Sequence, residues 1–175
     1  MIQLTIMPLF SEKTKKLKLS RNVVMLGLVS LFTDVSSEMI YPLIPVFVAA
    51  LGSGALLLGV IEGIAETTAS LLKLFSGIVS DKFRKRKLLV VIGYSISSFI
   101  RPFTGLVTSA WQIIFIRMLD RVGKGIRTAP RDALIAASCS ENQRGLAFGF
   151  HRAMDHTGAV IGPFLALLSL LILFI

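Results

Sequence analysis

Acidic residues stand at helical spacing inside two apolar stretches of the chain. Asp34 and Glu38 are four residues apart, as are Glu62 and Glu66, which places each pair on one face of a helix. Charged side chains in an apolar stretch are costly, and they usually face a charged partner or water. Because desolvation favours the protonated form of a carboxylate, Asp34 and Glu38, near the middle of their stretch, are candidate proton carriers.

Basic residues dominate a later stretch, which reads RMLDRVGKGIRTAPRD from Arg117 onward. Arg121 and Lys124 belong to it, and Arg101 stands in the apolar stretch before it. A carboxylate beside an arginine changes partner when it is protonated, and alternating access across a membrane requires such a two-state element. The excess of cations over acids in this stretch stabilises negative charge and therefore indicates an anionic solute.

A structural role for the same charges is the alternative. Buried charges persist in proteins when they are paired, and acids on two helices that face a cationic third helix would form such pairs. The residues to which this alternative applies best are Glu62, Glu66, Arg117 and Asp120. The functional interpretation is favoured for Asp34, Glu38, Arg101 and Arg121.

Five long apolar stretches must position these residues. Of the 175 residues, 54% are hydrophobic, which is more than a soluble domain of this length can bury. The stretches lack the alternating pattern of a membrane β-barrel, and each has roughly the 20 residues that a helix needs to cross ~30 Å of hydrocarbon. We therefore predict an all-α membrane protein with five transmembrane helices, at residues 22–51, 55–79, 88–107, 110–131 and 146–175.

Lysine and arginine fall on alternate sides of the predicted helices. The N-terminal segment 1–21 is basic, as are DKFRKRK after the second helix and SENQRG after the fourth, whereas GSG and TS after the first and third helices carry no charge. The positive-inside rule then places the N-terminus in the cytoplasm. A cleaved signal peptide is the alternative for the first stretch, but no A-x-A site follows it and the apolar run continues as IYPLIPVFVAAL.

The composition also excludes several classes of protein. The net charge of +9 lies beside apolar runs, where lipid headgroups and topology account for it better than a nucleic acid does. One cysteine, Cys139, allows no internal disulfide. His151 and His156 are five residues apart and share no helix face for a metal, and GKG at 123–125 lacks the rest of a phosphate loop. We expect no enzyme, metal or cofactor.

The connection after the second predicted helix holds a glycine, an aspartate and a basic cluster at defined spacing. The residues of this pattern are Gly77, Asp81, Lys82, Lys85, Arg86 and Lys87. The pattern resembles the signature loop of the major facilitator superfamily of secondary transporters, and it departs from that loop at Arg84, where the family has a second glycine. We expect Asp81 to accept bonds from the start of the next helix or to pair with an arginine.

Two further stretches resemble the same superfamily. The cationic stretch 110–131 is similar to its fourth helix, and the motif Gly158, Gly162 and Pro163 is similar to one that marks proton-coupled antiporters. The resemblance implies twelve helices in two six-helix halves, with the solute between them. It also implies that helices one and four line the cavity, which favours Asp34, Glu38, Arg117, Arg121 and Lys124.

By this resemblance the chain is the N-terminal part of a transporter, with residues 22–175 forming a truncated N-terminal helix bundle. The implied function is proton-coupled, alternating-access transport or efflux of a small anionic solute across the plasma (inner) membrane. Its partners would be the lipid bilayer, the solute, protons, and a missing C-terminal half or a second chain. The alternative is an inactive remnant, or a stand-alone five-helix subunit that needs a partner chain.

Small residues and prolines predict how the helices pack and bend. Glycines separated by three residues permit close contact between membrane helices, and the pairs are Gly59 and Gly63, Gly145 and Gly149, and Gly158 and Gly162. Prolines bend or break helices, and those in the predicted spans are Pro42, Pro45, Pro102, Pro130 and Pro163.

Overall fold

The computed structural model describes residues 19–50, 52 and 54–173. Most of the predicted cytoplasmic segment 1–21, together with residues 51, 53, 174 and 175, therefore lies outside the described residues. The described part is helical and contains no strand. Its elements are α1 (Arg21–Ile40), α2 (Leu43–Ala50), α3 (Ala55–Phe83), α4 (Arg86–Ile100), η1 (Arg101–Leu106), α5 (Ala110–Ala137), η2 (Glu141–Gln143) and α6 (Arg144–Leu173).

Serine caps begin two of these helices. The Ser20 hydroxyl accepts a bond from the backbone N–H of Val23 at 3.4 Å, at the start of α1. Ser109 and Gln112 form a reciprocal capping box at the start of α5. Such caps satisfy N–H groups that have no partner within the helix, so both helices begin where the apolar pattern predicts.

Four predicted boundaries differ from the structure, one of them because α5 continues to Ala137, beyond the predicted end at Arg131. The first span is broken, because α1 ends at Ile40 and α2 begins at Leu43, and Pro42 between them lacks the N–H that a continuous helix requires. The third span changes to a 3-10 helix at Arg101, next to Pro102. The second span continues to Phe83, so the residues predicted for the start of the signature loop lie on the last turns of α3.

Four segments are long and apolar enough to cross a membrane: Arg21–Ala50, Ala55–Phe83, Arg86–Leu106 and Glu141–Ile172. α5 carries too many charged residues to count as an apolar segment. Its 28 residues nevertheless rise about 42 Å at 1.5 Å per residue, which is long enough to cross a membrane. It also packs along α3 and α4. We therefore take α5 as the fifth crossing, whose charges face other helices.

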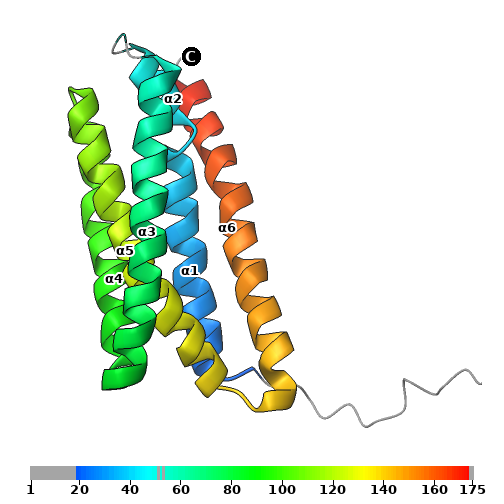
Figure 1. Cartoon of the computed structure of the whole chain (residues 1–175). Helices are drawn as coiled ribbons and strands as arrows, with labels where there is room; N and C mark the ends of the chain where they lie inside the picture. The colour runs from blue at the N-terminus through cyan, green and yellow to red at the C-terminus, as the bar shows by residue number, and fades with distance from the viewer. Residues whose placement is uncertain (1–18, 51, 53, 174–175) are drawn as a thin grey trace, which may run out of the picture.

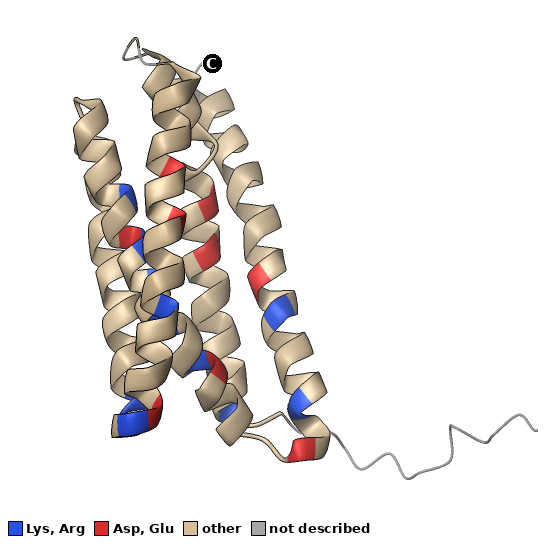
Figure 2. Cartoon of the chain, in the orientation of Figure 1, with Lys and Arg blue, Asp and Glu red and all other residues tan. Residues whose placement is uncertain are grey.

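Successive long helices run in opposite directions, with α2 continuing the direction of α1 (Figure 1). The start of α1, the turn from α3 to α4 and the connection from α5 to α6 lie at one end of the bundle, and α2 and the last turn of α6 lie at the other. Figure 2 shows lysine and arginine in all three elements at the first end. The positive-inside rule assigns this end to the cytoplasm, and we call it the cytoplasmic end.

The helices form two groups. α1 packs along α6, whereas α5 lies between α3 and α4, and contacts between the two groups are sparse. Glycines permit these approaches: a Cβ added at Gly162 would lie 2.8 Å from the Val35 carbonyl oxygen, and one at Gly125 would lie 2.8 Å from the Ala69 carbonyl oxygen. The predicted contact is therefore present for one glycine pair, Gly158 and Gly162.

For the other two glycine pairs the predicted contact is wrong within the described chain. A Cβ at Gly59, Gly63, Gly145 or Gly149 would meet no described atom within 4 Å. The closest approaches instead involve Gly93 and Gly123, where an added Cβ at either residue would lie 2.6–2.7 Å from the carbonyl oxygen of the other. Small residues therefore permit contact but do not choose the partner helix.

Two apolar clusters lie on either side of the charged residues of α1, α3, η1 and α5, which we call the charged layer. One cluster lies away from the cytoplasmic end and consists of Ile44, Val48, Ile61, Val107, Ile113 and Ile116. The other lies at the cytoplasmic end and consists of Val23, Ile135 and Ala147. Large apolar side chains on the outer faces of α3 and α6 are exposed, including Leu74, Ile78, Val160 and Phe164, which suits contact with hydrocarbon.

Candidate functional site

A narrow polar pocket lies between α1 on one side and η1 and α5 on the other. Its lining residues are Asp34, Ser37, Glu38, Tyr41, Arg101, Arg117, Asp120, Arg121, Lys124 and Arg127. All six cavity residues predicted from the sequence are in this set. The free volume is only about 10 Å³, which is room for about one water molecule, so the side chains are close to one another.

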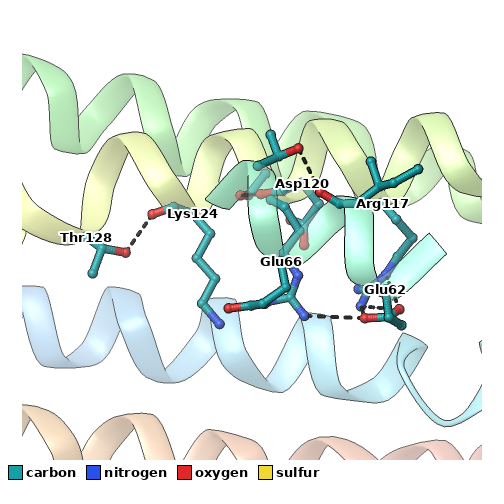
Figure 3. A network of polar contacts seen from close by, with 10 residues as sticks. Glu62, Glu66, Arg117, Asp120, Lys124 and Thr128 are labelled. Carbon is teal, nitrogen blue, oxygen red and sulfur yellow. Dashed lines mark hydrogen bonds and ion pairs between the residues drawn. The ribbon is translucent and has the colours of Figure 1, made fainter. Parts of the chain in front are cut away.

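Two arginines of α5 bind the glutamates of α3. Arg117 donates from Nη2 to both carboxylate oxygens of Glu62, at 2.9 and 3.0 Å, and its guanidinium lies 5.0 Å from the Tyr41 ring centroid. Arg121 is 3.9 Å from Glu62 and 3.7 Å from Glu66. Figure 3 shows Glu62 opposite Arg117 in this network. A forked arginine–carboxylate pair has a fixed geometry, so these contacts join α3 firmly to α5.

A second buried pair lies within the α3–α4–α5 group, and its arginine also contacts α1. Arg101 Nε donates to Asp120 Oδ1 at 3.0 Å, and the two side chains are only 7% and 9% exposed. Arg101 Nη1 donates to the carbonyl oxygen of Thr33 on α1 at 2.6 Å. Arg101, which the sequence indicates as a functional residue, thus also holds α1 against η1 and α5.

Four charged members of the pocket have no ion pair among the described residues. Arg127 donates instead to the Ser97 hydroxyl, and the other three are Asp34, Glu38 and Lys124. Figure 3 shows the Lys124 side chain extending from α5 toward α1, the helix that carries both carboxylates. Since no short ion pair holds them, these three side chains are the members of the pocket most free to exchange partners or protons.

The signature segment forms the turn between α3 and α4. Asp81 pairs with Arg86 across this turn at 3.6 Å, and Arg86 also donates to the carbonyl oxygen of Ala133 on α5 at 3.4 Å. Arg84, at the family's second glycine position, has φ 53° and is the one non-glycine residue with positive φ in the described chain. Glycine adopts this conformation without strain, which explains the family's residue there.

The other signature residues lie on or beside the same two helices. Gly77 lies in α3 near Ala129 of α5, with 3.5 Å from an added Cβ to the Ala129 Cβ. Lys82 is in the last turn of α3, Lys85 immediately precedes α4, and Lys87 is in the first turn of α4.

The motif of Gly158, Gly162 and Pro163 on α6 packs against the part of α1 that carries Asp34 and Glu38. Added Cβ atoms at Gly158 and Gly162 would lie 3.0 Å from the Asp34 Cβ and 2.6 Å from the Glu38 Cβ, respectively. Pro163 lies inside α6, directly after Gly162. The motif is therefore the surface of α6 on which this part of α1 rests.

Several buried polar residues were not among the predicted site residues. Arg127 lines the pocket, donates to the Ser97 hydroxyl at 2.7 Å and lies 4.5 Å from the centroid of the Tyr94 ring. A separate cluster nearer the cytoplasmic end contains Arg131, His151 and Asp155. The four-residue spacing from Arg127 to Arg131 and from His151 to Asp155 is the signal that would have found them.

The comparisons with known proteins identify the family. The profile of the Major Facilitator Superfamily matches residues 26–173, so the chain belongs to this family of membrane transporters. It is a multi-pass membrane protein. Family members are transporters and not enzymes.

Three relatives show the range of similarity. The chain is 44% identical to the uncharacterized MFS-type transporter MJ1317 of Methanocaldococcus jannaschii, over 89% of this chain and 39% of the relative. It is 33% identical to the uncharacterized protein Rv2265 of Mycobacterium tuberculosis (82% and 35% covered). It is 30% identical to the multidrug resistance protein MdtH of Photorhabdus laumondii (70% and 31% covered). The chain thus spans less than two fifths of the length of each.

Proposed function

We propose that the chain belongs to a secondary transporter in the plasma (inner) membrane that couples protons to the movement of a small anionic solute by alternating access. The observation that carries the proposal is the charged layer, in which Asp34, Glu38 and Lys124 have no ion pair among the described residues. Two carboxylates without fixed partners are suited to take up protons, and an ammonium group opposite them is suited to bind an anion.

The charge balance links the two events. The pocket holds five cations (Arg101, Arg117, Arg121, Lys124, Arg127) and three acids (Asp34, Glu38, Asp120), and Glu62 and Glu66, bound to two of the arginines, bring the acids to five. The layer is therefore neutral when every acid is ionised. Protonation of Asp34 and Glu38 would leave two positive charges, and an anion would compensate them.

This charge balance favours binding of protons and anion in the same state. The motif on α6 instead resembles that of antiporters, in which proton and solute move in opposite directions. Proteoliposomes distinguish the two: radiolabelled organic anion would accumulate toward the alkaline side if the two move together, and toward the acidic side if they exchange. A flux that does not change with the pH gradient would show that transport is not coupled to protons.

Two preparations would show whether the chain needs a partner chain for transport. The chain spans 39% of the M. jannaschii relative, so it should be assayed alone and with the remaining part of that relative as a second chain. Flux only in the second preparation would support the alternative of a subunit that needs a partner. The absence of gradient-driven flux in both preparations would favour an inactive remnant.

Arg121 tests the anionic part of the proposal. We expect Arg121→Gln to reduce anion flux about tenfold, because a loss of about 1.4 kcal/mol of anion stabilisation corresponds to that factor. Arg144→Gln, which removes a half-exposed cation at the start of α6, is the matched control and should retain flux. Unchanged uptake in Arg121→Gln would exclude an anionic solute bound in this pocket.

A further inference from the structure

A second charged cluster lies between the charged layer and the cytoplasmic end, where α1, α5 and α6 meet. Asp155 of α6 is 3.4 Å from His151 Nδ1 on its own helix and 3.9 Å from Arg131 Nη1 on α5. Arg131 also donates to the Ser30 hydroxyl of α1 at 3.4 Å and to Asp132 at 3.1 Å. One carboxylate is therefore shared between the two helix groups.

Two buried atoms of this cluster have no hydrogen-bond partner in the described chain: His151 Nε2 and Asp155 Oδ1. The His151 side chain is only 1% exposed. A carboxylate only accepts hydrogen bonds when ionised, so a neutral imidazole facing it carries its hydrogen on Nδ1 and has a lone pair on Nε2. A buried lone pair without a donor is costly, and it is a place where a proton can bind.

Charged groups from three helices surround the pair of His151 and Asp155. α5 contributes Arg131 and Asp132, and α6 contributes Asp155 and Arg152, which is 3.9 Å from Asp155 but more than half exposed. On α1, Asp34 is close enough to interact with the charge of Asp155. Because Arg152 is exposed, solvent and ions screen its charge. Asp155 is therefore the carboxylate that directly faces His151, and Arg131 is the buried cation that shares it.

We propose that His151 and Asp155 form a protonation site, separate from Asp34 and Glu38, that controls how firmly α6 is held to α5. A proton on His151 strengthens its pairing with Asp155 within α6 and weakens the hold of Arg131 on the same carboxylate. Arg131 keeps Asp132 as a partner on α5. Protonation would therefore loosen the cytoplasmic end between the two helix groups, and histidine changes charge between about pH 5 and 8. This inference does not depend on the solute proposed above.

The single cysteine provides the reporter. Cys139 is partly buried against the apolar cluster of Val23, Ile135 and Ala147, where α1, α5 and α6 meet, and its thiol contacts the Ile135 carbonyl oxygen at 3.2 Å. We would measure the rate at which a fluorescent maleimide alkylates Cys139 in the full chain in lipid nanodiscs, from pH 5 to pH 8. Dividing the wild-type rate by the His151→Gln rate at each pH cancels the intrinsic pH dependence of thiol chemistry.

We expect this ratio to rise by about fivefold or more from pH 8 to pH 5, which is the lower end of typical coupling between linked sites. Asp155→Asn should remove the same pH dependence. The control is His156→Gln, since His156 is the chain's only other histidine and is exposed, and it should behave like the wild type. A ratio that stays constant with pH, or a pH dependence lost in His156→Gln, would overturn the proposal.

A second measurement keeps the test decisive if His151→Gln does not fold. The His156→Gln variant, made with a tag free of histidine, leaves His151 as the only imidazole, so its NMR signal needs no assignment. We expect this signal to move between pH 5 and 8 and its midpoint to change in the Asp155→Asn, His156→Gln double variant. A signal that does not move over this range would show that no proton binds at His151.

Discussion

The two helix groups hold their charges differently. Within α3, α4, η1 and α5 two ion pairs between helices are short, at 2.9 Å for Arg117 and Glu62 and 3.0 Å for Arg101 and Asp120, and the pairs of Arg86 and Arg121 are longer, at 3.6–3.9 Å. The acids of α1 and α6 lack such partners: Asp34 and Glu38 have no ion pair in the described chain, and the contacts of Asp155 are 3.4–3.9 Å.

This difference distinguishes a rigid group of helices from a group whose charges can change partners. A short, forked arginine–carboxylate pair resists rearrangement, because breaking it leaves an uncompensated charge in an apolar setting. A carboxylate with distant or absent partners loses little when it takes up a proton. We therefore interpret the α3–α4–α5 group as the fixed frame and the α1–α6 pair as the part whose carboxylates respond to protons.

The largest expected effect separates these two roles. Arg101→Ala removes the partner of buried Asp120, and we expect a loss of about 3–5 kcal/mol in the free energy of unfolding. Asp34→Asn removes no ion pair and should cost less than about 1 kcal/mol. Denaturant unfolding in micelles, followed by circular dichroism, measures both. Equal losses in the two variants would contradict the division into frame and responsive pair.

The contact between α1 and α6 provides the next test. A methyl group at Gly162 would lie 2.6 Å from the Glu38 Cβ and 2.8 Å from the Val35 carbonyl oxygen. We expect Gly162→Ala to lower the free energy of unfolding by about 1–3 kcal/mol through overpacking. Gly59→Ala is the matched control, since its methyl group would enter open space and alanine favours a helix by about 1 kcal/mol. A stabilising Gly162→Ala would refute this close contact.

The turn between α3 and α4 should affect transport more than stability. Asp81 is 75% exposed and pairs with Arg86 at 3.6 Å, and exposed pairs contribute about 0–1 kcal/mol. We expect Asp81→Asn to insert and unfold like the wild type but to transport poorly, because we propose that the signature segment acts during alternating access. The flux would be measured in proteoliposomes, with the chain alone or with its partner chain, whichever preparation transports. Wild-type flux in this variant would show that Asp81 has no role in transport.

The smallest expected effect has the opposite sign. Arg84 has φ 53°, a conformation that costs a non-glycine residue about 1–2 kcal/mol. Glycine relieves this strain but loses about 0.5–1 kcal/mol through its greater freedom when unfolded. We therefore expect Arg84→Gly to raise the free energy of unfolding by about 0.5–1 kcal/mol. A loss of stability would mean that the Arg84 side chain makes contacts that matter more than its backbone strain.

Much of the architecture could be predicted because it depends on local pattern. Hydrocarbon requires about 20 apolar residues per helix, so composition located all five crossings, and basic connections indicated which ends lie together. The break near Pro42 and the caps at Ser20 and Ser109 also follow from local chemistry. The sequence likewise predicted six of the eight charged side chains that line the pocket, since charges in an apolar stretch tend to face inward, but it did not include Asp120 and Arg127.

Only the tertiary structure decided which charges are paired and which glycines are in contact. Glu62 with Glu66 and Asp34 with Glu38 have the same spacing in similar apolar stretches, yet α3 lies against the arginines of α5 while α1 lies against the glycines of α6. Three glycine pairs share one spacing, and one pair is in contact within the described chain. The helical period determines which residues share a face, whereas the partner of that face depends on which distant helix lies opposite it.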